Sequence, residues 1–173
     1  MSALIVIRGN SRAGKSTLAT CLAERIGRER TMVVGQDVVR RIILTPHGTV
    51  DVHARAVLRA LVTAGLGEGL DVIAEGIWFS GHYGPVLREL AAQHAGPSLF
   101  VRLEVPFDES VRRLAESPEA GEFTADDMRA WWRDRDPIAG VHEYVLSATE
   151  PPRELARFIL QTLYAPAPPR DGG

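Results

Sequence analysis

Residues 4–17 read Leu-Ile-Val-Ile-Arg-Gly-Asn-Ser-Arg-Ala-Gly-Lys-Ser-Thr, and this stretch decides the fold of the 173-residue chain. An apolar run at residues 4–7 leads into the pattern Gly-x-x-x-x-Gly-Lys-Ser, which starts at Gly9, and an amphipathic segment follows. A buried strand, a glycine-rich turn and a helix N-terminus form the context in which this pattern binds phosphate. The N–H groups of the turn converge on phosphate oxygens, and the helix dipole favours negative charge there. The sequence therefore predicts a site for a nucleoside triphosphate.

The residues of this loop have separate predicted roles. Gly9 and Gly14 permit backbone angles that a Cβ would oppose. Lys15 is expected to reach the β- and γ-phosphates, and the Ser16 hydroxyl is expected to ligate Mg²⁺. The residues predicted to bind the nucleotide are Gly9, Asn10, Ser11, Arg12, Ala13, Gly14, Lys15, Ser16 and Thr17.

The composition is that of a single globular domain. The chain is 45% hydrophobic and 24% charged, and its formal net charge of −2 gives no general electrostatic attraction to nucleic acid. Cys21 is the only cysteine, so no internal disulfide is expected. The N-terminus lacks the basic and apolar segments of a signal peptide, and no apolar run reaches membrane-spanning length. We therefore expect a cytoplasmic protein with no membrane partner, and the sequence carries no prediction of its oligomeric state.

Strand and helix signals alternate along the chain. The predicted strands are residues 3–8, 31–34, 72–74, 99–105 and 144–146. Helices are predicted over residues 15–26, 51–66 and 124–133, and a short helix is predicted from Asp37 to before Pro46. Three more are predicted from single residues: one with Pro85 in its first turn, one capped by Asp108 that runs to Ala115, and one that starts at Pro152. This alternation predicts an α/β fold with a doubly wound parallel sheet. We expect one domain over residues 1–164 and a disordered tail, rich in proline and glycine, at residues 165–173.

Parallel sheets bind ligands beyond the carboxyl ends of their strands, so the residues just after each strand are the candidates for chemistry. Asp37 follows the second predicted strand. It is either the base that accepts or orients the proton of an acceptor hydroxyl, or the N-cap of its helix, and the two roles are compatible. Arg40 and Arg41 lie one turn further on, as clamps for a substrate or as solvated residues.

A second group follows the third predicted strand. Glu75 ends an apolar run in the manner of a Walker B acid, and we expect it to hold Mg²⁺ or to bind a substrate hydroxyl. Trp78 and Tyr83 are candidates for the wall of a substrate pocket, although core packing explains either of them equally well.

A third group is made of arginines. Phosphoryl transfer gathers negative charge on the γ-phosphoryl oxygens, and arginines commonly neutralise that charge. Arg133 and Arg135 follow the polar stretch 116–123, and are either catalytic residues carried by a closing lid or part of a solvated helix end. Arg113 precedes that stretch and is a candidate contact to the nucleotide.

The chain resembles the small P-loop kinases of the nucleoside-monophosphate-kinase-like superfamily, among them gluconate and shikimate kinases, chloramphenicol phosphotransferase and polynucleotide 5′-kinases. The resemblance extends to about residue 164 and rests on the Gly9–Ser16 motif, Asp37, residues 103–109 with Arg112 and Arg113, and the pair Arg133 and Arg135. It implies a three-layer P-loop NTPase fold with a five-stranded parallel sheet of order 2-3-1-4-5, helices on both faces and a small mobile lid at about residues 116–135. It also implies Mg·ATP as phosphoryl donor and a role for residues 148–152 in holding the adenine. Shikimate kinases carry Asp-x-Asp after the second strand, whereas this chain has a single aspartate there.

Three functions fit the sequence. The favoured one is an ATP-dependent kinase that phosphorylates a hydroxyl of a small molecule, such as a sugar, cyclitol, nucleoside or antibiotic. In that reading Asp37 is the base and Arg133 or Arg135 stabilises the transition state. A polynucleotide 5′-hydroxyl kinase would use the same chemistry but needs a basic channel for the strand. The third is a nucleotide-binding regulatory module without kinase activity. Asp37, a candidate base where an acceptor would bind, favours an enzyme over such a module.

Overall fold

The computed structural model describes residues 2–44, 50–118 and 120–165. Its strands are β1 (Leu4–Gly9), β2 (Thr31–Gly35), β3 (Asp71–Gly76), β4 (Ser98–Glu104) and β5 (Glu143–Ser147). Its helices are α1 (Lys15–Ile26), α2 (Val50–Gly67), α3 (Ser80–Gln93), α4 (Phe107–Ala115), α5 (Ala125–Trp131) and α6 (Pro152–Leu163), with a 3-10 turn η1 (Arg28–Arg30) and a π-helical turn η2 (Val38–Ile43). Pro46 and the predicted tail from residue 166 onward lie outside the described residues.

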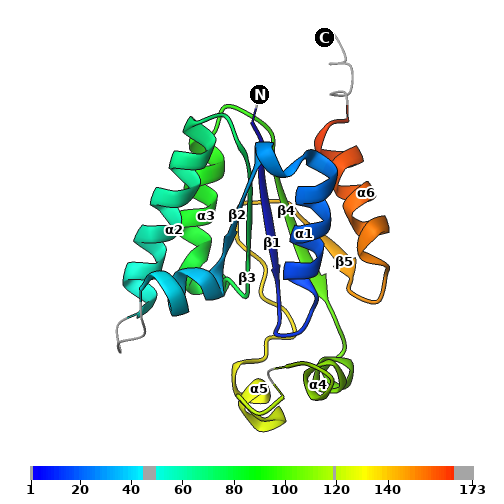
Figure 1. The fold of residues 1–173 in the computed structure, drawn as a ribbon. Coiled ribbons are helices and arrows are strands. Elements are labelled where there is room, and N and C mark those ends of the chain that lie inside the picture. The colour runs from blue at the N-terminus through cyan, green and yellow to red at the C-terminus, as the bar shows by residue number, and fades with distance from the viewer. Residues whose placement is uncertain (1, 45–49, 119, 166–173) are drawn as a thin grey trace.

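All the strands described pair in parallel in one sheet of order β2-β3-β1-β4-β5, which confirms the predicted α/β fold and its strand order. Helices α2 and α3 cover one face of the sheet and α1 and α6 the other (Figure 1). Alternate residues of β1 serve the two cores: Ile5 and Ile7 pack with α1 and α6, and Leu4 and Val6 pack with α2 and α3. A strand covered on both faces needs apolar residues at successive positions, which is why 4–7 is a continuous apolar run.

Two helices begin earlier than the sequence suggests. Helix α3 starts at Ser80, so Pro85 lies inside the helix rather than in its first turn. Helix α4 starts at Phe107 with Pro106 as N-cap and no side-chain cap bond, so Asp108 lies in the first turn and does not cap it. An acidic residue in the first turn still stabilises the helix through its dipole, which accounts for the similar sequence signal.

The start of α5 agrees with the prediction and its end does not. Thr124 and Asp127 form the predicted capping box, with the Asp127 N–H donating to the Thr124 hydroxyl and the Asp127 carboxylate accepting from the Thr124 N–H. The helix ends at Trp131, two residues before the predicted end at Arg133. The chain beyond α5 is therefore extended where the sequence predicts helix.

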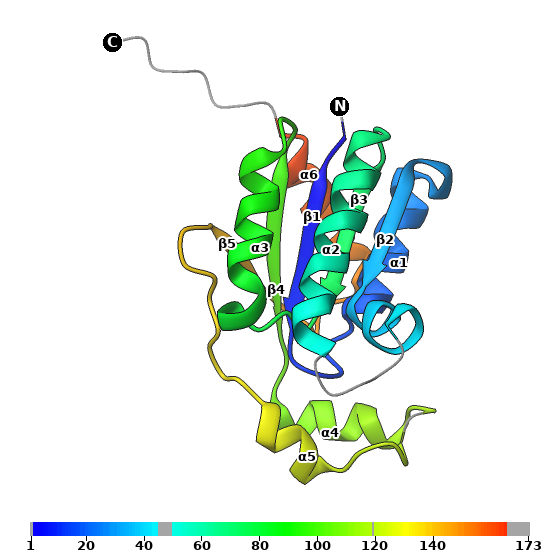
Figure 2. The ribbon, with the colours of Figure 1, turned by 90° about the vertical axis from the view of Figure 1, so that its left-hand side faces the viewer.

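Helices α4 and α5, with the described chain between them, project beyond the carboxyl ends of the strands (Figures 1 and 2). We call this part, residues 107–131, the lid. Residues 132–138, here called the strap, lead from the lid back toward α3, and the chain then reaches the edge strand β5 (Figure 2). Among the described residues, no helix has the length and the apolar character needed to cross a bilayer.

Candidate active site

A cleft of about 1050 Å³ opens at the carboxyl ends of the strands, where ligands bind in parallel sheets. The loop after β1 lines it with residues 11–18, and the segments after β2 and β3 line it with residues 36–37, 40–41 and 75–77. The lid contributes Arg113, Glu122, Phe123 and Trp131. The remaining lining residues are Phe79, His82, Tyr83, Leu103, residues 148–152 and Leu155. Most of the residues predicted from sequence thus share one cavity. Its volume is at the upper end of the range for pockets that hold one drug-sized ligand, which leaves room for a nucleotide and a second molecule.

The loop at residues 9–16 adopts backbone angles that depend on its glycines. Gly14 has φ 82° at the N-cap of α1, in the left-handed region. Gly9 has φ 149°, and a Cβ there would lie 2.5 Å from the carbonyl oxygen of Leu103. A larger residue at either position would displace the loop, because both conformations are unfavourable for a residue with a Cβ.

Lys15 is the buried cation of the cleft. Its side chain is only 9% exposed, and its Nζ donates a hydrogen bond to the backbone oxygen of Asn10 at 2.8 Å. Burial lowers the pKa of Lys15 to about 8, an effect that the nearby carboxylates of Glu75 and Asp37 oppose. Lys15 therefore lies close enough to Glu75 and Asp37 to interact with both carboxylates.

Ser16 and Glu75 meet although they are far apart in the sequence. The Ser16 hydroxyl donates a hydrogen bond to Glu75 Oε1 at 3.1 Å. The contact arises because Glu75 pairs with Ile7 of β1 and with Gly35 of β2, so β3 carries the carboxylate up to the loop. Burial raises the pKa of Glu75, while Lys15 and the Ser16 hydrogen bond oppose the rise. A hydroxyl and a carboxylate side by side are hard oxygen ligands and fit Mg²⁺, which usually takes few protein ligands and completes its shell with waters and phosphates.

Asp37 lies at the edge of the same cleft with its carboxylate available. It occupies the N-cap position of η2 but makes no side-chain cap hydrogen bond, so the capping role considered from sequence is absent. Its side chain is 82% exposed, and Arg41 Nε lies 3.8 Å from its Oδ1. Arg41 also bonds Glu122 of the lid at 2.9 Å, and Arg40 lines the cleft nearby. Asp37, Arg40 and Arg41 thus line the part of the cleft beside η2.

Arg113 joins the parts of the cleft where a nucleotide is expected. Its guanidinium donates to the carbonyl oxygen of Arg12 in the loop at 3.2 Å and to that of Ala148 at 2.9 Å, and pairs with Glu109 at 2.7 Å. This places Arg113 between the phosphate-binding loop and residues 148–152, as the prediction of a nucleotide contact requires.

Five predicted residues do not line the cleft: Gly9 and Asn10, which line a second cavity, and Trp78, Arg133 and Arg135. Trp78 is fully buried in the core, edge-on to Tyr83 with 4.8 Å between ring centroids, and does not line the cleft. Its neighbour Phe79 does so instead, because Trp78 adopts φ 37° and the chain reverses there. Arg133 lines the second cavity, of about 510 Å³, on the other side of the loop, and the exposed Arg135 lines neither cavity.

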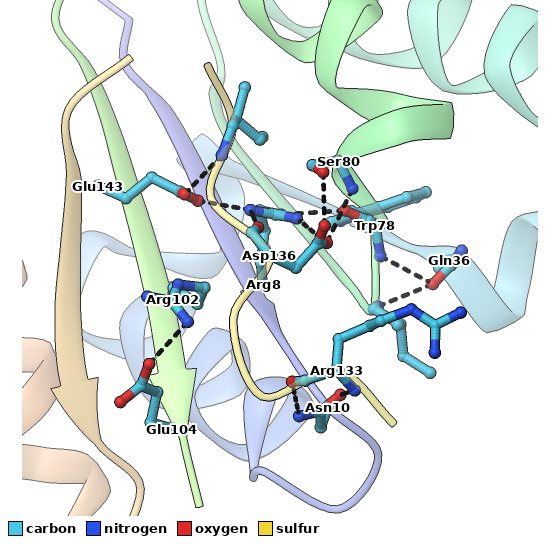
Figure 3. Close-up of polar contacts among 12 residues, drawn as sticks. Arg8, Asn10, Gln36, Trp78, Ser80, Arg102, Glu104, Arg133, Asp136 and Glu143 are labelled. Carbon is cyan, nitrogen blue, oxygen red and sulfur yellow. Dashed lines mark hydrogen bonds and ion pairs between the residues drawn. The ribbon is translucent and has the colours of Figure 1, made fainter. Parts of the chain in front are cut away.

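The structure adds residues that sequence reasoning missed. Gln36 is buried, and its side-chain oxygen accepts hydrogen bonds from the N–H groups of Ile77 at 2.8 Å and Trp78 at 3.4 Å (Figure 3). It holds the turn that brings Phe79 into the cleft. Arg8, only 1% exposed, is bound by carboxylates of the strap and of β5. The sequence signal that could have identified Arg8 is its charge, because it follows the apolar residues 4–7 within one predicted strand.

Comparison with known proteins agrees with this geometry. A family model described as AAA domain matches residues 4–135, which is most of the chain and includes the loop, Asp37, Glu75 and the lid. The chain belongs to this AAA domain family. No curated protein is significantly similar to the chain in sequence.

Solved structures place this AAA domain among kinase-like P-loop folds. A putative kinase from Chloroflexus aurantiacus J-10-fl has a TM-score of 0.71 at 18% identity over 94% of this chain and 96% of its own. A gluconokinase from Sinorhizobium meliloti 1021 has a TM-score of 0.65 at 19% identity, covering 93% and 91%. The APS kinase of Mycobacterium tuberculosis, solved with AMPPNP and APS, has a TM-score of 0.69 at 20% identity, covering 95% and 99%. At these identities the likeness concerns the fold alone.

Proposed function

We propose that this protein is an ATP-dependent kinase that transfers the γ-phosphoryl group to a hydroxyl of a small molecule. The observation that carries the proposal is the convergence of three features on one cleft: the buried Lys15, the Ser16–Glu75 hydrogen bond, and the uncapped carboxylate of Asp37. A fold of the kinase-like P-loop type supports the same conclusion.

In the proposed reaction the acceptor oxygen attacks the γ-phosphorus and the bond to the β–γ bridging oxygen breaks. The acceptor proton passes to Asp37, and ADP leaves with the electron pair of the broken bond. The transition state is loose, so positioning and charge stabilisation matter more than early proton removal. Lys15 and the loop N–H groups hold the phosphates. Mg²⁺, when bound by Ser16 and Glu75, would neutralise charge between the β- and γ-phosphates.

The part of the cleft beside η2 suggests a compact polar substrate. Phe79 supplies ring surface, while Asp37, Arg40 and Arg41 supply polar groups. Tyr83 also borders the cleft, but it is only 2% exposed and packs in the core beside Trp78. The Arg41–Glu122 ion pair links this side to the lid, so lid position and acceptor binding are coupled in the proposal. The acceptor would bind between η2 and α3, opposite the nucleotide at residues 148–152.

The test is an ADP-release screen with Mg·ATP against sugars, cyclitols, nucleosides, hydroxyl-bearing antibiotics and 5′-hydroxyl oligonucleotides. We expect one class of small hydroxyl compound to raise ADP release well above the basal rate, and Asp37→Asn to abolish that rise. Stimulation by oligonucleotides alone, with binding that weakens steeply in salt, would indicate a polynucleotide kinase. Intact nucleotide binding with no stimulation by any hydroxyl compound would refute the kinase proposal and favour a regulatory module.

A further inference from the structure

The strap is anchored to the core at Asp136. The buried Arg8 of β1 donates to the Asp136 carbonyl oxygen at 2.8 Å and to its carboxylate at 2.6 Å. The N–H and hydroxyl of Ser80 donate to the same carboxylate at 2.8 and 2.5 Å (Figure 3). Asp136 thereby supplies an acceptor to the N-terminus of α3, whose own N-cap, Phe79, has none.

The far end of the strap is fixed by the same arginine. Arg8 also pairs with Glu143 at 2.7 Å, and Glu143 accepts a hydrogen bond from the N–H of Ile138 at 2.9 Å. A guanidinium that is 1% exposed is costly to leave unpaired, so these contacts are difficult to break singly. The Asp136–Ile138 end of the strap therefore belongs to the rigid core.

The lid end of the strap is held by Asn10 of the phosphate-binding loop. The Asn10 side-chain nitrogen donates to the carbonyl oxygen of Arg133 at 2.7 Å, and its oxygen accepts from the Arg133 N–H at 3.1 Å (Figure 3). One amide group satisfies both backbone groups of Arg133. The backbone oxygen of Asn10 accepts the Lys15 Nζ hydrogen bond at 2.8 Å. Asn10 thus contacts both Lys15 and Arg133.

We propose that Asn10 is a positioning residue: its side-chain amide holds the backbone of Arg133 on the phosphate-binding loop, so that Arg133 stays with the core while the lid moves. This inference rests on the proposed kinase function for its catalytic consequence. It places the pivot of the lid between Trp131, where α5 ends, and Arg133. The mobile part then ends at residue 131, whereas the lid expected from sequence, residues 116–135, extends four residues further.

This arrangement holds the backbone of Arg133 beside the phosphate-binding loop. Its guanidinium carbon lies 5.2 Å from the centre of the Phe79 ring, and in Figure 3 the side chain extends toward the side of the sheet where Gln36 lies. The guanidinium also donates a hydrogen bond to the carbonyl oxygen of Trp132 at 2.8 Å. In the proposal, a change of the Arg133 rotamer would direct this charge toward the γ-phosphoryl group without movement of the strap. A charge whose backbone is already in place stabilises a transition state at little cost of reorganisation.

The experiment combines amide exchange with kinetics on Asn10→Ala, Arg133→Ala and the double variant. In Asn10→Ala, exchange of the peptide covering residues 132–135 should be about tenfold faster, because two hydrogen bonds are lost. Turnover with saturating acceptor should fall by a similar factor while Mg·ATP affinity changes little. Asn10→Ser, whose side chain is too short to reach both backbone groups, should behave similarly if Asn10→Ala proves unstable.

The double variant separates positioning from a general structural role. If Asn10 acts through Arg133, the losses in kcat are not additive, and Asn10→Ala costs little once Arg133 is alanine. Arg88→Ala is the matched control: Arg88 donates to the Ala139 carbonyl oxygen at 2.7 Å, so its loss should leave residues 132–135 and kcat unchanged.

Unchanged exchange at residues 132–135 in Asn10→Ala, or fully additive losses in kcat, would overturn the inference. Failure of the proposed function gives a different result. In that case no acceptor stimulates the wild-type protein, while the exchange measurement still reports whether Asn10 holds the strap.

Discussion

The lowered pKa of Lys15 predicts that nucleotide binding weakens over a defined pH range. Burial lowers this pKa to about 8 in the nucleotide-free protein. The lysine is then about nine-tenths charged at pH 7 and about one-tenth charged at pH 9. Phosphates need the charged form, so the Kd for ATP should rise about tenfold between these pH values. The phosphates themselves contribute little, because their second ionisation lies at about pH 6.

Titration calorimetry at pH 7, 8 and 9, in buffers of different ionisation enthalpy, measures both the Kd and the protons taken up. At pH 9 binding should take up close to one proton, because bound phosphate raises the pKa of Lys15 again. Lys15→Met, which has no titrating group at this position, is the control, and its weaker binding should not vary with pH. The prediction would be refuted by a wild-type Kd that stays constant from pH 7 to 9, or by a Kd of Lys15→Met that rises with pH as steeply as that of the wild type.

The same shift has a consequence for the stability of the nucleotide-free protein. The folded-state pKa lies below the unfolded value of 10.5, so below about pH 8 the full cost of burying the charge is present. As pH rises from about 8 to 10.5, the folded protein loses this proton before the unfolded chain does, and stability rises by about 3 kcal/mol from this group. The gain should be absent in Lys15→Met, as judged from denaturant unfolding at pH 8 and 10.

Three further changes have defined outcomes. Asp37→Asn should lower kcat about a hundredfold with unchanged melting temperature, because the carboxylate makes no cap bond; full activity would move the role of base to Glu75. Glu75→Gln should raise the Mg²⁺ concentration for half-maximal activity about tenfold or more, measured by Mg²⁺ titration at saturating ATP, and an unchanged requirement would remove Glu75 from the metal site. Asp136→Ala should lower the free energy of unfolding by about 3 kcal/mol in denaturant titrations, because Arg8 loses one of its two carboxylate partners; a loss below about 1 kcal/mol would show that the pair is not stabilising.

Local sequence patterns were enough to predict several parts of this protein. The Gly9–Ser16 loop, the start of α1 at Lys15, the capping box at Thr124 and the start of α6 at Pro152 all depend on residues within a few positions of one another. The alternation of apolar strands with helices was enough to predict a parallel sheet, because a helix between successive strands carries the chain back so that the strands run in the same direction. Asp37 and Glu75 were candidates for the site because each follows a predicted strand, and Arg113 was a candidate because it precedes the polar stretch 116–123.

Which of these side chains contact one another depends on the tertiary structure. Ser16 reaches Glu75, 59 positions away, because β3 pairs with β1 in a register that aligns Ile7 with Glu75. Arg8 of β1 contacts Asp136 across 128 positions, and this contact ties one end of the strap to the sheet. A positive φ at Trp78 turns that ring into the core and leaves Phe79 in the cleft. Such contacts depend on strand order, register and single backbone angles, and a sequence pattern that reports only near neighbours contains none of them.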